Sequence, residues 1–150
     1  MRVVIQRVSE SAVVIDDTEV ASINKGLLIL LGIEMEDTKD DAVWLVNKIS
    51  KLRIFSDEEG VMNKSILEVN AEVIVVSQFT LHAKTKKGNR PSYIKAARSE
   101  QAIPLYEQFK KDLSLSIGNE VQSGEFGTNM QVSLINDGPV TILIDTKNKE

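Results

Sequence analysis

The sequence predicts a single α/β domain that combines mixed β-sheets with two main helices. The chain has 150 residues, the usual size of one domain, and 42% of them are hydrophobic, which is enough for a substantial core. Short runs of β-branched and apolar residues recur along the chain, and two longer segments repeat their apolar residues with helical spacing. No repeat, low-complexity tract or linker divides the sequence.

The N-terminal part of the chain predicts strands. Residues 2–8 have the composition of a strand, and residues 12–15 and 19–23 flank the turn-forming pair at 16–17, which predicts a β-hairpin. Residues 27–32 are continuously apolar, as is typical of a strand that is buried on both faces.

The first helix is expected after Thr38, an N-cap residue with Asp41 three positions later as its capping-box partner. Its apolar stripe consists of Ala42, Leu45, Val46 and Ile49. The second helix is expected from about Ser99 to Ile117, with Gly118 as its stop, and Pro104 predicts a kink in the first turn or a later start. Its inward side chains are expected to be Tyr106, Phe109 and Leu113.

Three further strands complete the predicted domain. Residues 73–81 predict a central strand, and residues 131–135 and 140–145 predict two last strands, separated by the turn formers Asn136-Asp137-Gly138-Pro139. We therefore place the domain at residues 1–145 and expect residues 146–150 to form a frayed, charged tail.

The residue inventory excludes several kinds of site. The chain has no cysteine, so it has no disulfide, no thiolate nucleophile and no zinc site built on cysteine. Its one histidine, His82, rules out multi-histidine metal sites, and no nucleotide-binding or metal-binding motif is present. We expect no cofactor and no metal.

The sequence also predicts a cytoplasmic protein with no membrane partner. The longest apolar run, Gly26 to Ile33, is far shorter than the roughly 20 residues that a membrane helix needs. The first residues lack the pattern of a signal peptide, and the absence of cysteine fits a reducing compartment.

The charge is unevenly distributed. The net charge is −4, but the tract from His82 to Arg98 holds six basic residues and no acidic one, which leaves 12 basic and 22 acidic residues, a net −10, for the rest. The six are Lys84, Lys86, Lys87, Arg90, Lys95 and Arg98. Such a tract is either a solvated loop or a local contact for a polyanion.

Ser77-Gln78-Phe79-Thr80-Leu81 ends the predicted central strand, where α/β sheets tend to place sites. Ser77 and Thr80 are candidate nucleophiles, and His82 is the one candidate imidazole base. On an extended strand the Cα atoms of Thr80 and His82 lie ~6.6 Å apart, whereas a base must come within ~3.2 Å of the proton that it takes. From chemistry alone we favour the simpler interpretation, in which the hydroxyls satisfy backbone groups and His82 lies in a surface loop.

Two glycine-containing segments allow two interpretations each. The segment from Asn136 to Thr141 is a hairpin turn or, with a cis Gly138–Pro139 bond, a rigid backbone unit whose carbonyls face nearly the same side. In the segment from Gly124 to Met130, two glycines three positions apart suit a close backbone approach. Phe126 and Met130 either line a pocket there or belong to the core.

The order of five motifs resembles the D-aminoacyl-tRNA deacylase family, of the D-tyrosyl-tRNA deacylase type. The motifs are Arg7 in the first strand, Ser77-Gln78-Phe79-Thr80-Leu81, Gly88-Asn89-Arg90-Pro91-Ser92, Phe126-Gly127-Thr128-Asn129-Met130, and Asn136-Asp137-Gly138-Pro139-Val140-Thr141. The resemblance runs from Met1 to about Asp145, and the Ser-Gln-Phe-Thr and Gly-Pro signatures are its most specific parts. His82 is a departure, because we know no family-wide histidine at that position.

The resemblance implies an editing hydrolase with the fold of this family. It would cleave the ester of D-aminoacyl-tRNA, or of glycine mischarged on an alanine tRNA, and release the free amino acid and tRNA. It would be a homodimer with active sites at the subunit interface. A cis Gly138–Pro139 unit would enter the partner's site and exclude an L side chain, with Arg7 and Asn136 supporting that unit.

The resemblance also implies roles for the other motifs. Catalysis would involve Ser77, Gln78, Phe79 and Thr80, with the backbone N–H groups of Phe79 and Thr80 near the scissile carbonyl. The adenosine pocket would include Phe126, Gly127 and Met130, and the tRNA backbone would contact Lys84, Lys86, Lys87 and Arg90. The terminal 2′-hydroxyl of the tRNA would assist the reaction, which fits a chain with one histidine.

Two alternatives stay open at this point. One is an esterase that uses Thr80 as its nucleophile. The other is a dimer that binds nucleic acid through the lysine-rich tract and has no enzymatic activity.

Overall fold

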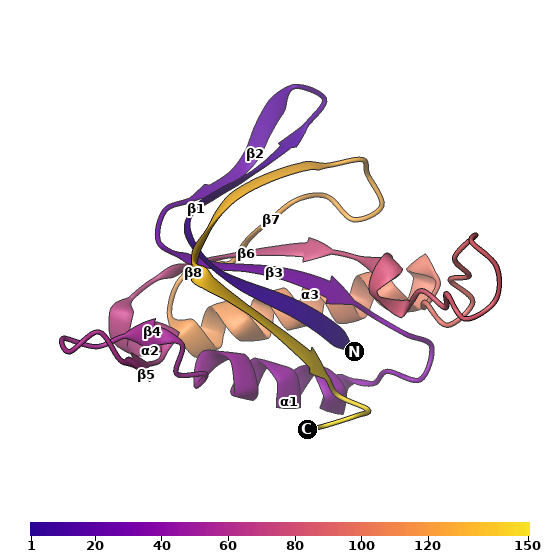
Figure 1. The fold of residues 1–150 in the computed structure, drawn as a ribbon. Coiled ribbons are helices and arrows are strands. Elements are labelled where there is room, and N and C mark those ends of the chain that lie inside the picture. The colour runs from indigo at the N-terminus through magenta and orange to yellow at the C-terminus, as the bar shows by residue number, and fades with distance from the viewer.

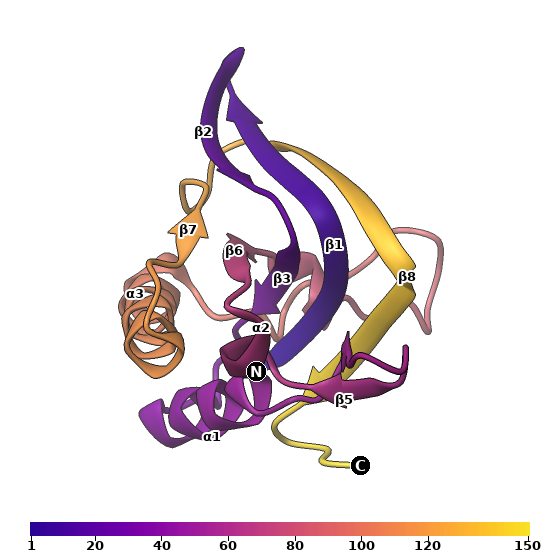
Figure 2. The ribbon, with the colours of Figure 1, turned by 90° about the vertical axis from the view of Figure 1, so that its left-hand side faces the viewer.

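A strongly curved β-sheet wraps over two helices in the computed structural model, which describes residues 1–150 (Figures 1 and 2). The helices are α1 (Lys39–Ser50), α2 (Ile66–Val69) and α3 (Ser99–Ile117), with one short 3-10 helix, η1 (Phe79–His82). The main sheet holds β1 (Arg2–Ile15), β2 (Thr18–Ile23), β3 (Gly26–Gly32), β6 (Glu72–Ser77), β7 (Gln122–Ser123) and β8 (Gln131–Asp145). A separate two-stranded sheet joins β4 (Phe55–Ser56) and β5 (Met62–Lys64).

The sheet is mixed, as predicted. Its order is β2-β1-β3-β6-β7, and β8 pairs with β1. β1 runs antiparallel to β2, β3 and β8, whereas β3, β6 and β7 are parallel to one another. β3 is buried along almost its whole length, which agrees with the continuous apolar run that predicted it. The α/β class with two main helices is therefore confirmed.

Two predicted strand breaks are wrong. Residues 2–8 and 12–15 form one continuous strand, β1, which pairs first with β3 and then with β2. Residues 131–135 and 140–145 likewise belong to one strand, β8, and both halves pair with β1. The turn formers at 136–139 therefore do not reverse the chain, because the neighbouring strand holds both flanks in line.

The central strand is shorter than predicted. β6 ends at Ser77 instead of residue 81, and the chain turns into η1 two residues later. β6 itself is buried from Val73 to Val76, and its parallel pairing with β3 places the carboxyl ends of the two strands side by side. The polar residues that follow Val76 thus lie at a sheet edge, as the sequence suggested.

The helix signals are confirmed in most respects. Asp41 accepts a hydrogen bond from the backbone N–H of Thr38 at 2.9 Å, which completes the predicted capping box. Burial acts to raise the pKa of Asp41, but its hydrogen bonds with Lys147 and Thr38 outweigh this and hold the pKa well below its ordinary value. α3 ends at Ile117, and Gly118, with a φ of 72°, provides the left-handed C-cap. α3 begins at Ser99, as predicted, and includes Pro104, so the later start that Pro104 offered as an alternative does not occur.

A buried ion pair lies at the start of the first strand. The α-ammonium group of Met1 donates to the carboxylate of Asp37 and to Oγ1 of Thr146, and both members of the ion pair are fully buried. Asp37 also accepts from the backbone N–H of Glu34 at 2.7 Å. Thr146 and Lys147 were expected in a frayed tail, but Thr146 is buried and Lys147 pairs with Asp41.

No helix of the structure has both the length and the apolar composition that crossing a bilayer requires.

Candidate active site

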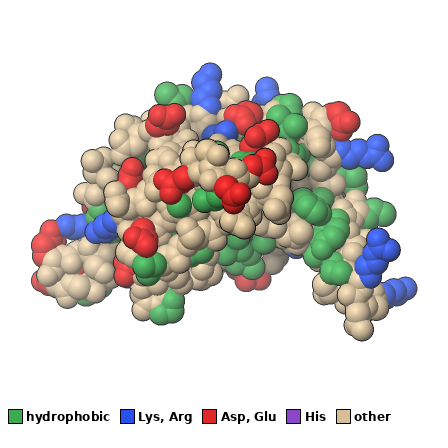
Figure 3. Space-filling view, turned by 90° about the horizontal axis from the view of Figure 1, so that it is seen from above, with side chains coloured by type: hydrophobic (Ala, Val, Ile, Leu, Met, Phe, Trp, Pro, Cys, Tyr) green, Lys and Arg blue, Asp and Glu red, His purple; other side chains and the backbone are tan.

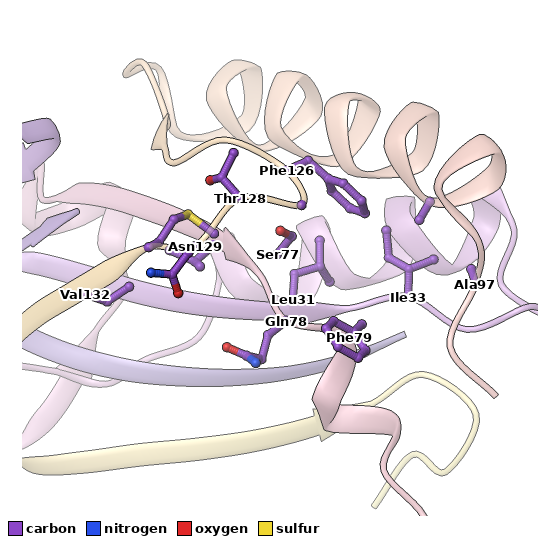
Figure 4. Close-up of a pocket in the computed structure, with 14 residues that line it drawn as sticks. Leu31, Ile33, Ser77, Gln78, Phe79, Ala97, Phe126, Thr128, Asn129 and Val132 are labelled. Carbon is purple, nitrogen blue, oxygen red and sulfur yellow. The ribbon is translucent and has the colours of Figure 1, made fainter. Parts of the chain in front are cut away.

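A pocket of about 280 Å³ opens where β3 and β6 end, beside the start of α3 and the segment that leads into β8 (Figure 4). Six residues that the sequence singled out line it: Ser77, Gln78, Phe79, Phe126, Gly127 and Met130. The other lining residues are Leu31, Ile33, Val76, Ala97, Ala102, Thr128, Asn129 and Val132. Figure 4 shows Ser77 at the end of its strand, with Phe126 on the side of α3 and Phe79 on the opposite side.

The turn after β6 fixes the polar side of the pocket. The backbone N–H of Gln78 donates to the carbonyl of Leu31 at 2.8 Å and so extends the β3–β6 pairing by one residue. Phe79 and Thr80 then begin η1, so the helix itself offers their backbone N–H groups no acceptor. The side-chain amide of Gln78 donates to Oγ1 of Thr80. Thr80 itself is not among the lining residues, although Phe79, which precedes it, is.

The opposite wall of the pocket rests on aromatic packing. The ring of Phe126 meets the ring of Tyr106 edge to face, with centroids 5.6 Å apart. Tyr106 is buried and donates to the carbonyl of Val75 at 2.8 Å, and its burial raises the pKa of the phenol above its ordinary value. Gly124 leaves the space that the side chain of Met130 occupies, because a Cβ atom at Gly124 would overlap the Met130 sulfur.

No titratable side chain lines this pocket. His82, the one imidazole, is not among the lining residues, and the prediction that it lies in a surface loop is wrong: it is buried, packed against Gly32 of β3. Neither of its ring nitrogens has a hydrogen-bond partner. Sequence reasoning missed this burial, because it depends on the space that Gly32 leaves. The pocket therefore offers hydroxyl, amide and backbone groups, but no protein acid or base.

Gly138 and Pro139 lie outside this pocket, in the middle of β8. The pairing skips from Gln6–Thr141 to Val8–Asn136, so residues 137–140 form a bulge opposite Arg7 alone. The Gly138–Pro139 peptide bond is cis, as the resemblance implied, and Gly138 has a φ of 129°. Both residues are exposed, and neither lines the pocket of the same chain.

Arg7 and Asn136 hold the bulge from inside. The buried guanidinium of Arg7 donates to the carbonyl of Asp137 at 3.1 Å and to that of Ile54 at 2.7 Å. It also forms an ion pair of 3.3 Å with the Asp137 carboxylate. The amide of Asn136 donates to the carbonyls of Arg7 and Val140, at 3.0 and 2.9 Å. The structure therefore brings Arg7 and Asn136 together with the Gly-Pro unit.

The lysine-rich tract protrudes beyond η1, at the end of β6 that also bears the pocket (Figure 1). Lys84 and Ser92 exchange two backbone hydrogen bonds, of 2.8 and 3.0 Å, which close the loop between them. Lys84, Lys86, Lys87 and Arg90 are exposed and form no ion pair with an acidic side chain. The protruding segment shows basic and hydrophobic side chains and no acidic ones in Figure 3.

Comparison with known proteins assigns the family. A family model described as D-Tyr-tRNA(Tyr) deacylase matches residues 4–145. The chain belongs to this family. It is 65% identical over the full length of both chains to a protein of Bacteroides fragilis strain YCH46 that is named D-aminoacyl-tRNA deacylase. The expected class of enzyme, a hydrolase that removes an acyl group, is thereby confirmed.

Two solved structures share the fold of this D-Tyr-tRNA(Tyr) deacylase family member. One, named c-Myc DNA Unwinding Element Binding Protein, has a TM-score of 0.90 and 38% identity, over 97% of this chain and 98% of the other. The second is described as a probable eukaryotic D-amino acid tRNA deacylase, and has a TM-score of 0.81 and 17% identity over 95% and 97% of the two chains. At that identity, the second likeness shows the fold alone.

Proposed function

We propose that the pocket hydrolyses the ester that joins a D-amino acid, or a glycine mischarged on an alanine tRNA, to the terminal adenosine of a tRNA. The observation that carries this proposal is the pocket without a titratable side chain, next to backbone N–H groups at the start of η1. Ester hydrolysis needs donors for the developing oxyanion, and preorganised backbone N–H groups supply them. In this proposal the donors are the N–H groups of Phe79 and Thr80, with Ser77 and Gln78 completing that wall.

The proton transfers then fall to the substrate. A water molecule attacks the ester carbonyl carbon, the bond from that carbon to the ribose 3′-oxygen breaks, and the 3′-oxygen takes up a proton. The neighbouring 2′-hydroxyl positions the water and relays its proton to the leaving oxygen. This assignment is supported by the lining of the pocket, which contains no titratable side chain, and by the burial of His82, which is not among the lining residues. A base must reach the proton that it takes, and no side chain here does so.

The adenosine is assigned to the opposite wall, formed by Phe126, Gly127 and Met130. An aromatic ring and a thioether offer the flat and adaptable apolar surfaces that suit a nucleobase. The anchoring of Phe126 on Tyr106 supports this role, because it fixes the ring before the substrate arrives.

Selection of D-amino acids is assigned to Gly138 and Pro139 of a second copy in a homodimer. Both residues are exposed and outside the pocket of their own chain, so a contact with substrate requires another subunit. Backbone carbonyls held by Arg7 and Asn136 act as a rigid wall that overlaps with an L side chain. Glycine escapes this exclusion because it has no side chain.

Lys84, Lys86, Lys87 and Arg90 are proposed to contact phosphates of the tRNA. Their exposure and their lack of acidic partners support this role. Such contacts give affinity that falls with salt and depends little on base sequence. We further propose a cytoplasmic location, where aminoacyl-tRNA is used, and a catalytic domain that spans residues 1–145.

The proposal predicts the order of hydrolysis rates for matched D-, L- and glycyl-tRNAs. Because a steric wall penalises one side-chain position, D-aminoacyl- and glycyl-tRNA should be hydrolysed at least about 100-fold faster than L-aminoacyl-tRNA. Single-turnover measurements of labelled aminoacyl-tRNA give the three rates. Equal rates for the D and L forms would contradict the proposed selectivity, whatever the absolute activity.

A second prediction separates substrate-assisted catalysis from a Thr80 nucleophile. Thr80→Ala should retain most of the wild-type rate, since Thr80 does not line the pocket. Wild-type enzyme should lose nearly all activity on tRNA that lacks the terminal 2′-hydroxyl. The two rates are measured against wild-type enzyme on the ordinary substrate. Near-normal hydrolysis of the deoxy substrate contradicts the RNA-assisted mechanism, and an inactive Thr80→Ala that is folded favours the esterase alternative.

One competing function, nucleic-acid binding without catalysis, is favoured by the name of the 38% identical protein of known structure, which describes it as binding a DNA unwinding element. The rate measurements distinguish the two functions. A purified chain that binds tRNA but hydrolyses none of the three aminoacyl-tRNAs would have the competing function.

A further inference from the structure

Tyr93 is an exposed aromatic residue next to the pocket that the proposed reaction does not use. Its ring meets that of Phe79 edge to face, with centroids 4.9 Å apart and planes at 74°. Phe79 lines the pocket, so Tyr93 lies one ring beyond the pocket wall. The residue Tyr93 is 38% exposed and Phe79 is 55% exposed, so ring surface of both is free for contact. An edge-to-face pair of this kind holds each ring in a defined orientation.

The backbone on both sides of Tyr93 is fixed. Ser92, the preceding residue, exchanges two backbone hydrogen bonds with Lys84, and the carbonyl of Tyr93 accepts from the N–H of Ala96 at 3.0 Å. Ala97 then joins the end of β3 by donating to the carbonyl of Ile33 at 2.9 Å. The ring therefore stands on an ordered support, and a ligand that contacts it loses little free energy in ordering the protein.

The charges around Tyr93 indicate the chemistry of its ligand. It stands within the tract that has six cations and no acidic residue, and Lys95 follows it by two positions. None of these cations pairs with a carboxylate. An aromatic face among unpaired cations suits a single nucleic-acid strand, whose bases stack while its phosphates meet the cations. An amino-acid side chain would use the ring but not the charges.

We propose that Tyr93, supported by Phe79, stacks against an unpaired base that precedes the terminal adenosine in the 3′ end of the tRNA. The assignment rests on the proposed function, because that function places the terminal adenosine in the pocket that Phe79 also lines. Tyr93 acts as a binding residue for the single strand and takes no part in the reaction at the ester. Its contribution therefore belongs to KM and not to kcat.

The test compares a substrate that has the preceding nucleotides with one that lacks them. Tyr93→Ala is expected to raise KM for D-aminoacyl-tRNA about tenfold or more, in line with the cost of losing one base–aromatic stack. On D-aminoacyl-adenosine, which has no preceding base, the same variant should match the wild type in kcat and KM. Tyr93→Phe and Tyr93→Trp should stay near the wild type on both substrates, because they keep the ring face.

Ile94→Ala is the matched control, since Ile94 is the next residue, is 70% exposed and carries no ring. Its kcat and KM on both substrates should equal those of the wild type. An equal loss by Tyr93→Ala on the two substrates would overturn the proposal, as it would indicate a contact to the amino acid or damage to the fold. No loss on either substrate, or a loss in Tyr93→Phe and Tyr93→Trp as large as in Tyr93→Ala, would overturn it too.

A binding measurement keeps this proposal separate from the proposed function. The probe is a short oligoribonucleotide with the sequence of the tRNA 3′ end, compared with adenosine alone by titration calorimetry. Tyr93→Ala should weaken binding of the oligonucleotide about tenfold and leave binding of adenosine unchanged. If wild-type protein hydrolyses no aminoacyl-tRNA, the proposed function fails while this titration still decides the stacking. If it hydrolyses the substrate and the titration shows no difference between wild type and Tyr93→Ala, the stacking proposal alone fails.

Discussion

Arg7→Met should lower kcat/KM for D-aminoacyl-tRNA by about 100-fold and the free energy of unfolding by about 3 kcal/mol. Methionine fills much of the same space but removes every donor of the guanidinium. The carbonyls of Ile54 and Asp137 then lose their partners, and the bulge that presents Gly138 and Pro139 loses its internal support. In the proposed function, the backbone wall that excludes an L side chain must be held to within about an ångström, so a displaced bulge costs rate as well as selectivity.

Kinetics on D-aminoacyl-tRNA and urea unfolding followed by circular dichroism measure the two effects of Arg7→Met. Arg53→Met is the matched control, because Arg53 is exposed and bonds only to Asn63, away from the pocket. Its kcat/KM should equal that of the wild type. The kcat/KM of Arg7→Lys should lie between those of Arg7→Met and the wild type, because lysine keeps the charge but not the planar guanidinium that reaches two carbonyls. Full activity per folded molecule of Arg7→Met would refute the assigned role of Arg7.

Asp37→Ala should lower the free energy of unfolding by about 3–5 kcal/mol, the usual cost of removing one member of a buried ion pair. The α-ammonium group of Met1 then stays buried with Oγ1 of Thr146 as its remaining hydrogen-bond acceptor. Lys147, whose Nζ lies 3.8 Å from the Asp37 carboxylate, also loses a nearby negative charge. The backbone N–H of Glu34 also loses its acceptor. Asp37→Asn should cost less, because an amide oxygen still accepts hydrogen bonds.

Urea unfolding at neutral pH measures the loss in Asp37→Ala. Glu36→Ala provides the comparison, because Glu36 is the preceding residue and its side chain is exposed. That variant should stay within about 0.5 kcal/mol of the wild type. A similar result for both variants would mean that the buried pair contributes no net stability.

Local chemistry made part of the fold predictable. The continuous apolar run at 27–32 is typical of a strand covered on both faces, and β3 is that strand. Sequence alone also locates two helix ends, because the contacts that fix them lie within a few residues. These are the start of α1, marked by Thr38 and Asp41, and the end of α3, marked by Gly118. The short elements β4, β5, β7 and α2 were missed because two to four residues carry too little periodic signal.

The remaining features depend on contacts between distant residues. Asn136 to Pro139 have the composition of a hairpin turn, and the same composition suits a bulge. The choice is made by β1, more than a hundred residues away, which pairs with both flanks of that segment. His82 has the appearance of a loop residue in the sequence, and its burial follows from the space that Gly32 leaves in β3.

The candidate site shows the same division. Ser77, Gln78 and Phe79 were predictable as the polar end of a buried strand, and they line the pocket. The position of Thr80 was not predictable, because the chain turns into η1 and leaves the Thr80 side chain outside the pocket lining. For the same reason, Thr80 and His82 do not share one face of an extended strand. The carbonyl of Ile54 as a partner of Arg7 has no signature in sequence at all.

The pairing of β1 with β8 has a consequence for the order of events during synthesis. The first strand to leave the ribosome, β1, pairs with the last one, β8. Residues 131–145 have residues 2–14 as their partners, so this pairing cannot form before the end of the chain is made. Until they emerge, the pocket lacks Val132 and the bulge at Arg7 does not exist. A nascent chain therefore has neither the complete pocket nor the bulge until nearly all of it has been translated.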